Sequence, residues 1–216
     1  MSVPRLLLWC TIFATAFGVI EGAVVVYLRE LCYPLGFAFP LKEMPRRILA
    51  IEIVREAATL LLLLGVAMIA QRRPVRRFAV FAFCFGVWDI TYYLALKAFL
   101  GWPPSLLTWD ILFLIPLPWT GPVLAPVLVS LALIVAAVAF LRRPEDARPF
   151  LRPIDWIVEA IAGLVIVTSF FWSAHDVELW GAPSSYPWWL FAIGYGGGGV
   201  WFLWRACTPP APPHPP

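Results

Sequence analysis

Charged residues are scarce in this chain. Asp, Glu, Lys and Arg make up 13% of its 216 residues, whereas the apolar and aromatic types with cysteine make up 62%. A soluble domain carries about 25% charged residues, roughly twice this share. The composition therefore excludes an ordinary water-soluble enzyme, a nucleic-acid-binding protein and a disordered scaffold. It predicts a polytopic membrane protein with lipids as its surroundings.

Cysteine and histidine are also few, and familiar chemical motifs are missing. The four cysteines form no CxxC pair, so neither a disulfide framework nor a thiol-redox pair is predicted. The chain has no GxSG serine, no paired histidines for haem and no ExxH pair for a di-iron site. Its glycine run, residues 194–199, lacks the register of a nucleotide-binding loop. These missing motifs do not identify a cofactor, so its identity stays open.

What the sequence does contain is a set of six apolar runs, each long enough to cross a bilayer. They are Leu6–Leu28, Ile48–Ala70, Phe78–Leu100, Pro122–Leu141, Ile154–Ser173 and Pro187–Trp204. We expect the first run to be a retained anchor; a cleaved signal peptide is the alternative. The predicted fold is an all-α membrane protein with a single transmembrane domain, residues 1–205, and a mobile proline-rich tail, residues 206–216.

A seventh apolar stretch, Leu106–Ile115, is too short to cross. It is followed by Pro116, Pro118 and Pro122, and proline interrupts regular helix. Irregular backbone at membrane depth requires burial in protein or contact with a wet cavity. We therefore expect Ser105–Gly121 to form a short re-entrant or interfacial half-helix.

The basic residues predict the orientation. Ten of the 16 lie near the termini or in the loops after the second and fourth runs. By the positive-inside rule these segments face the cytoplasm, so both termini are predicted to be cytoplasmic in a plasma or inner membrane.

Ionisable residues inside the runs indicate a site, because each costs about 2.5–3.5 kcal/mol to insert. Six of them share the outer half of the membrane or its centre: Glu21, Glu52, Arg55, Glu56, Asp89 and Asp110. The spacing of Glu52, Arg55 and Glu56 places them on one helix face. Asp89 shares its helix face with Tyr92 and Tyr93. We expect these faces to converge on one pocket.

Charge counting limits the chemistry of that pocket. Glu21, Glu52, Glu56 and Asp89 outnumber Arg55, so either carboxyl groups are protonated, or a cation binds, or His175 supplies a proton. Five residues are predicted to be catalytic: Glu21, Glu52, Arg55, Glu56 and Asp89. Tyr92, Tyr93, Asp110 and His175 are predicted to support them. An oxygen-rich set of Glu21, Glu56 and Asp89 suits Mg, Ca or Mn as a metal site.

Each signal also has a purely structural interpretation. Arg55 bridging the glutamates is a candidate ion-pair lock between helices, and the tyrosines are candidate interfacial anchors. The glycine run indicates either close packing of another helix or an unwound segment beside a ligand.

Three functions fit the sequence. The first is an enzyme acting on a lipid-like substrate, with the acids as general acid/base groups. The second is a small carrier, or the substrate-binding subunit of a transporter, for a cation or cationic solute. The third is a structural subunit. The small size of the chain favours a homo-oligomer or a larger membrane complex as its working form.

Overall fold

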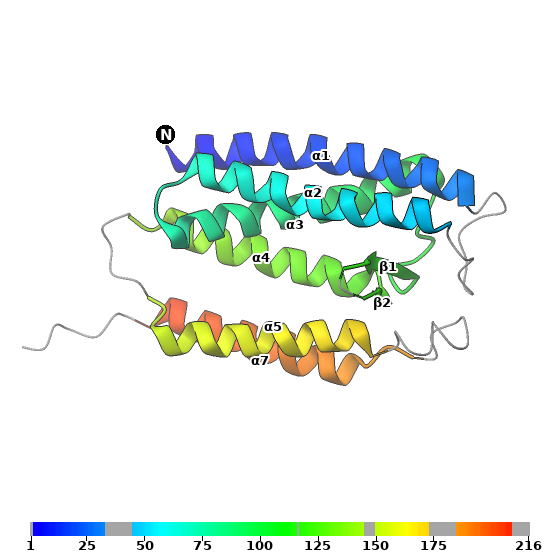
Figure 1. The fold of residues 1–216 in the computed structure, drawn as a ribbon. Helices are drawn as coiled ribbons and strands as arrows, with labels where there is room; N and C mark the ends of the chain where they lie inside the picture. The colour runs from blue at the N-terminus through cyan, green and yellow to red at the C-terminus, as the bar shows by residue number, and fades with distance from the viewer. Residues whose placement is uncertain (1, 33–44, 116, 145–149, 173–184, 209–216) are drawn as a thin grey trace, which may run out of the picture.

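The computed structural model describes residues 2–32, 45–115, 117–144, 150–172 and 185–208. Over these residues the chain is mostly helical, and successive long helices run side by side in alternating directions (Figure 1). The long helices are α1 (Val3–Cys32), α2 (Arg46–Ala70), α3 (Pro74–Leu100), α4 (Leu124–Arg142), α5 (Pro153–Phe171) and α7 (Trp188–Cys207). Each of the six predicted apolar runs therefore corresponds to a helix.

Five of these helices, α1 to α5, are long and apolar enough to cross a membrane. The multi-pass helical architecture predicted from the sequence is supported by them. Although α7 contains 20 residues, it is not among the five. Its glycine, tryptophan and tyrosine residues contribute little hydropathy.

Helix α3 is the central element, packing against α1, α2 and α4. Its approach to α1 depends on small residues: a methyl group added at Gly18 would lie 2.7 Å from the Trp88 carbonyl oxygen, and one at Gly22 would lie 2.8 Å from Ala95 Cβ. The small-residue row on α1 thus permits close packing. Because these glycines face α3, they also determine the direction in which Glu21 of the same helix points.

Between α3 and α4 the chain forms a β-hairpin, so the predicted half-helix is wrong. Strand β1 (Trp109–Phe113) pairs antiparallel with β2 (Trp119–Pro122), with Asp110 opposite Gly121. The proline argument correctly excluded helix in the second half of this segment. It overlooked that an extended second half provides hydrogen-bond partners for the first, whose Trp, Ile and Phe residues favour strand.

The hairpin lies at the end of the bundle opposite the start of α1 and the end of α7 (Figure 1). Between these ends, α1 to α4 enclose an apolar core that includes Leu63, Val80 and Cys84. A second apolar cluster around Phe170 and Tyr186 supports the hairpin from the side of α5 and α7.

Helix α7 is continuous through its glycine run, so the unwound segment considered above does not occur. Packing accounts for two of the glycines: methyl groups at Gly194 and Gly198 would lie 2.8 Å from the Ala162 carbonyl oxygen and 2.9 Å from Ala162 Cβ on α5. At the end of α7, Arg205 Nε donates to Asp155 Oδ2 at 2.9 Å.

Candidate functional site

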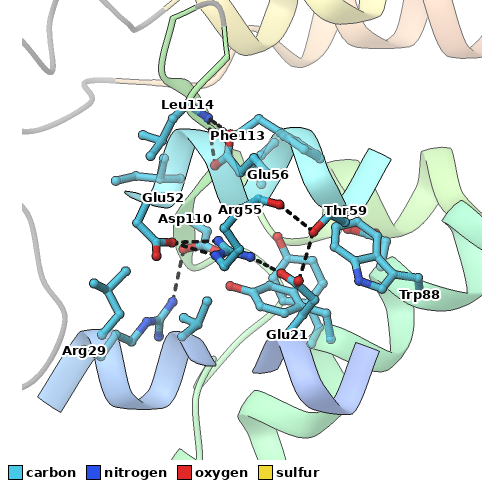
Figure 2. Close-up of a pocket in the computed structure, with 17 residues that line it drawn as sticks. Glu21, Arg29, Glu52, Arg55, Glu56, Thr59, Trp88, Asp110, Phe113 and Leu114 are labelled. Carbon is cyan, nitrogen blue, oxygen red and sulfur yellow. Dashed lines mark hydrogen bonds and ion pairs between the residues drawn. The ribbon is translucent and has the colours of Figure 1, made fainter. Parts of the chain in front are cut away.

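A cavity of about 120 Å³ lies between α1, α2, α3 and the hairpin. Figure 2 shows side chains from these elements directed toward one another around it. Helix spacing explains the gathering, because residues three, four and seven apart share one face. Glu52, Arg55, Glu56 and Thr59 use this spacing on α2, and all four line the cavity.

Arg55 joins α2 to α1 across the cavity. Its guanidinium is ion-paired with Glu21 on α1 and donates to Glu52 Oε2 at 2.8 Å. The Thr59 hydroxyl donates to the other Glu21 oxygen at 2.9 Å. Helices α1 and α2 do not pack closely on each other. These polar contacts therefore form the link between the two helices at this level.

Two further contacts hold the hairpin over the cavity. The backbone N–H of Leu114 donates to both Glu56 oxygens, at 2.9 and 3.1 Å. Arg29, near the end of α1, donates to Asp110 Oδ1 at 3.2 Å, and its guanidinium carbon lies 3.8 Å from the centre of a Trp102 ring. Glu56 and Arg29 consequently have a structural function in addition to their charge.

The two remaining carboxyl groups of the lining belong to Asp89 and Asp110. Asp89 Oδ2 accepts from the Ser130 hydroxyl of α4 at 2.8 Å. Asp110 is 2% exposed, yet its Oδ2 has no hydrogen-bond partner among the described residues, nor has Nε1 of Trp88. A buried polar atom without a partner costs about 1–3 kcal/mol. The residues that line the cavity thus include one buried acceptor and one buried donor without a described partner.

The cavity has an excess of acidic groups. Its lining contains the five carboxyl groups of Glu21, Glu52, Glu56, Asp89 and Asp110, against two guanidinium groups. Burial raises the pKa of Asp110 to about 6, although the Arg29 charge opposes the rise. Full ionisation would leave three uncompensated negative charges, so the site favours either bound cations or protons.

Eight of the predicted site residues line this one cavity: Glu21, Glu52, Arg55, Glu56, Asp89, Tyr92, Tyr93 and Asp110. The ninth, His175, lies outside the described residues. No group of three His, Cys, Asp or Glu side chains among the described residues is arranged to hold a metal ion. Glu21, Glu56 and Asp89 thus share the cavity without forming a ligand set. Their catalytic and metal-binding roles stay predictions.

Three participants were not predicted from the sequence. Arg29 lies just beyond the predicted first run, although its spacing of eight residues from Glu21 places both on one side of α1. Trp88 precedes Asp89 and was not distinguished from an ordinary core aromatic. Ser130 interrupts the apolar run of α4, which was the available signal for a polar partner.

The fold and the cavity together describe a multi-pass helical membrane protein with a polar site enclosed by three helices and a hairpin. No protein-family model, curated protein or solved structure matches the chain.

Proposed function

We propose that this chain is a six-span protein of the plasma or inner membrane, with both termini in the cytoplasm and the cavity toward the outer face. The alternating helices support this arrangement, because the start of α1 and the end of α7 lie at one end and the hairpin at the other (Figure 1). The basic residues of the α2–α3 turn, the end of α4 and Arg205 lie at the terminal end, as the positive-inside rule requires.

The cavity is proposed to bind and exchange cations or protons at the outer face. The observation that carries this proposal is the excess of five carboxyl groups over two guanidinium groups around one buried cavity. Intramembrane charges are functional by default, since they are costly to insert. Asp89 and Asp110 are the proposed exchanging groups, because the glutamates are engaged with Arg55, Thr59 and the hairpin backbone.

We infer that the site acts on a lipid-like substrate presented from the membrane, with Asp89 and Asp110 as general acid/base groups. A cavity confined to the hairpin end of the bundle supports this choice over a carrier, because the apolar core of α1 to α4 fills the space between the cavity and the terminal end. The continuous α7 removes the unwound segment that favoured transport.

The ion-pair lock is the competing interpretation, and one observation favours it. Arg55 contacts both Glu21 and Glu52, and Glu56 binds the Leu114 backbone, so each of these groups has a structural partner. A lock does not account for Asp110 Oδ2, which has no partner in the described structure. The two interpretations therefore differ at Asp110 and Asp89.

The test is the double variant Asp89→Asn/Asp110→Asn, in detergent, with Glu30→Gln as the control. Glu30 is exposed near the end of α1 and does not line the cavity. We expect the thermal midpoint of the wild-type protein and of Glu30→Gln to respond to pH, to added cations such as Na⁺, Mg²⁺, Ca²⁺ or Mn²⁺, or to both. The double variant should lose this response and should leave co-purified lipids unconverted in mass spectra. Equal responses in all three proteins would contradict the proposal.

A further inference from the structure

The cavity contains two buried groups whose hydrogen-bonding capacity is unused within the described structure. Asp110 Oδ2 is an acceptor on β1, and Trp88 Nε1 is a donor on α3; both residues are more than nine-tenths buried and line the cavity. Buried polar atoms in folded proteins almost always have partners. A ligand donor close to the aspartate, or a ligand acceptor close to the indole, would therefore be favourable at this site.

The charges of the lining determine the sign of the ligand. The Arg55 guanidinium uses Nε and both terminal nitrogens on Glu52 and Glu21. Arg29 is engaged with Asp110 Oδ1 and stacks over a Trp102 ring. Since the cationic side chains already have anionic partners, the surplus carboxyl groups attract a positively charged ligand.

Aromatic rings in the same lining indicate an organic cation. Trp88 lies 6.4 Å from Tyr92 and 6.3 Å from Phe113 between ring centres, and Tyr93 lies 5.1 Å from Tyr92. Ring faces attract ammonium groups. They do not coordinate Mg²⁺ or Ca²⁺, which require about six oxygen ligands, and the described residues contain no group arranged for a metal.

The size of the cavity restricts what enters it. Pockets that enclose a complete drug-sized ligand have volumes of about 300–1,000 Å³, whereas this cavity has about 120 Å³. It therefore accommodates a small head group while the rest of a larger molecule stays outside. Helices α1 and α2 both line the cavity without packing closely on each other, and Ile20 and Tyr27, next to lining residues in the sequence of α1, are exposed.

We propose that the cavity binds a primary ammonium group, which donates to Asp110 and is surrounded by the other carboxyl groups and the aromatic rings of the lining. This inference rests on the proposed cation-handling function and names the chemical class of its ligand. The ammonium group belongs either to a membrane amphiphile or to a free amine; both share the same head-group chemistry.

The first test compares ethanolamine with ethylene glycol, its neutral counterpart of similar size, on the full chain in detergent. We expect ethanolamine to raise the thermal midpoint and to change the tryptophan fluorescence in a saturable way, and ethylene glycol to do neither. Asp110→Asn should weaken ethanolamine binding about tenfold or more. Trp88→Phe should weaken it less, and Glu30→Gln should match the wild-type protein.

Reconstitution identifies the source of the head group. Greater stability in vesicles containing phosphatidylethanolamine than in phosphatidylcholine vesicles would assign the ammonium to a lipid, whereas a response to added ethanolamine alone would assign it to a free amine. Either result supports the inference.

Two outcomes would overturn the inference, and they separate it from the proposed function. Saturable stabilisation by Na⁺ or Mg²⁺ through Asp89 and Asp110, with none by ethanolamine or the amine lipid, refutes the ammonium ligand but leaves cation handling intact. An equal response to ethanolamine and ethylene glycol also refutes it. If Asp110→Asn does not fold, the comparison of the two probes on wild-type protein and Trp88→Phe still decides the question.

Discussion

At the scale of single residues, the carboxyl groups around the cavity divide into two kinds. Glu21, Glu52 and Glu56 each accept from a group on another part of the chain or from Arg55. Asp110 retains a buried oxygen without a described partner. Groups of the first kind stabilise the arrangement of α1, α2 and the hairpin, while those of the second remain available to a ligand. Substitutions should separate these contributions.

Glu56 provides the sharpest test of the structural kind. Glu56→Gln keeps one oxygen for the Leu114 N–H, so we expect only a small loss of stability. Glu56→Ala leaves that N–H without its partner and should lower the free energy of unfolding by about 1–3 kcal/mol. Thermal or denaturant unfolding in detergent measures both changes. Similar losses in the two variants would show that the hydrogen bond to the hairpin is not what Glu56 contributes.

Asp110 should make stability depend on pH. Its pKa is about 6 in the folded protein, above the ordinary value of 3.8, because burial disfavours the ionised form. The folded state then binds more protons than the unfolded state between these values, so stability falls as pH rises from about 4 to about 6. Interactions with Arg29, the Ile111 N–H and the Tyr93 hydroxyl oppose the shift, and Asp89 and Tyr92 on α3 are also close to this carboxyl group.

The measurement is the difference in thermal midpoint between wild type and Asp110→Asn across this pH range. Acids remote from the cavity titrate equally in both proteins, so the difference reports Asp110 together with its electrostatic coupling to Asp89. We expect the wild-type midpoint to decline more steeply than that of the variant. Parallel curves would mean that Asp110 has the same affinity for protons in the folded and unfolded chain.

At the scale of elements, α7 shows how one glycine run contains positions of two kinds. Methyl groups at Gly194 and Gly198 would collide with Ala162 of α5, whereas Gly196, Gly197 and Gly199 have nothing within 4 Å of the added atom. Gly194 and Gly198 therefore let α5 and α7 approach closely. The other three lower helix propensity without any packing benefit in the described structure.

Alanine substitutions along α7 should consequently have opposite signs. Gly194→Ala and Gly198→Ala are expected to lower stability by about 1–3 kcal/mol through overpacking. Gly197→Ala and Gly199→Ala should raise it by up to about 1 kcal/mol each, because alanine favours helix. Unfolding midpoints in detergent compare the two pairs. Destabilisation by Gly197→Ala or Gly199→Ala would reveal a packing partner for that face.

Local sequence patterns predicted the long helices but not the hairpin. Long, mainly uncharged runs located all six long helices, including α7, which is not among the five that are apolar enough to cross a membrane. Prolines in residues 116–122 excluded helix there, but strand pairing joins Trp109–Phe113 to a separate segment and depends on both together.

Helix spacing placed Glu52, Arg55 and Glu56 on one face, and the structure brings that face to the cavity. Partners such as Ser130 and Arg29 depend on how helices pack, which spacing within one helix does not encode.

At the scale of the whole molecule, the native cysteines provide a test of orientation. Cys207 is exposed at the terminal end and Cys32 is partly exposed at the hairpin end, while Cys10 and Cys84 are buried. If the termini are cytoplasmic, a membrane-impermeant maleimide added to intact cells should label Cys32 and leave Cys207 unlabelled until the cells are permeabilised. Cys32→Ser should abolish the first signal, and Cys207→Ser should abolish the additional one. Labelling of Cys207 in intact cells would reverse the orientation and would place the cavity toward the cytoplasm, where the proposed ligand would have to approach from the inner leaflet.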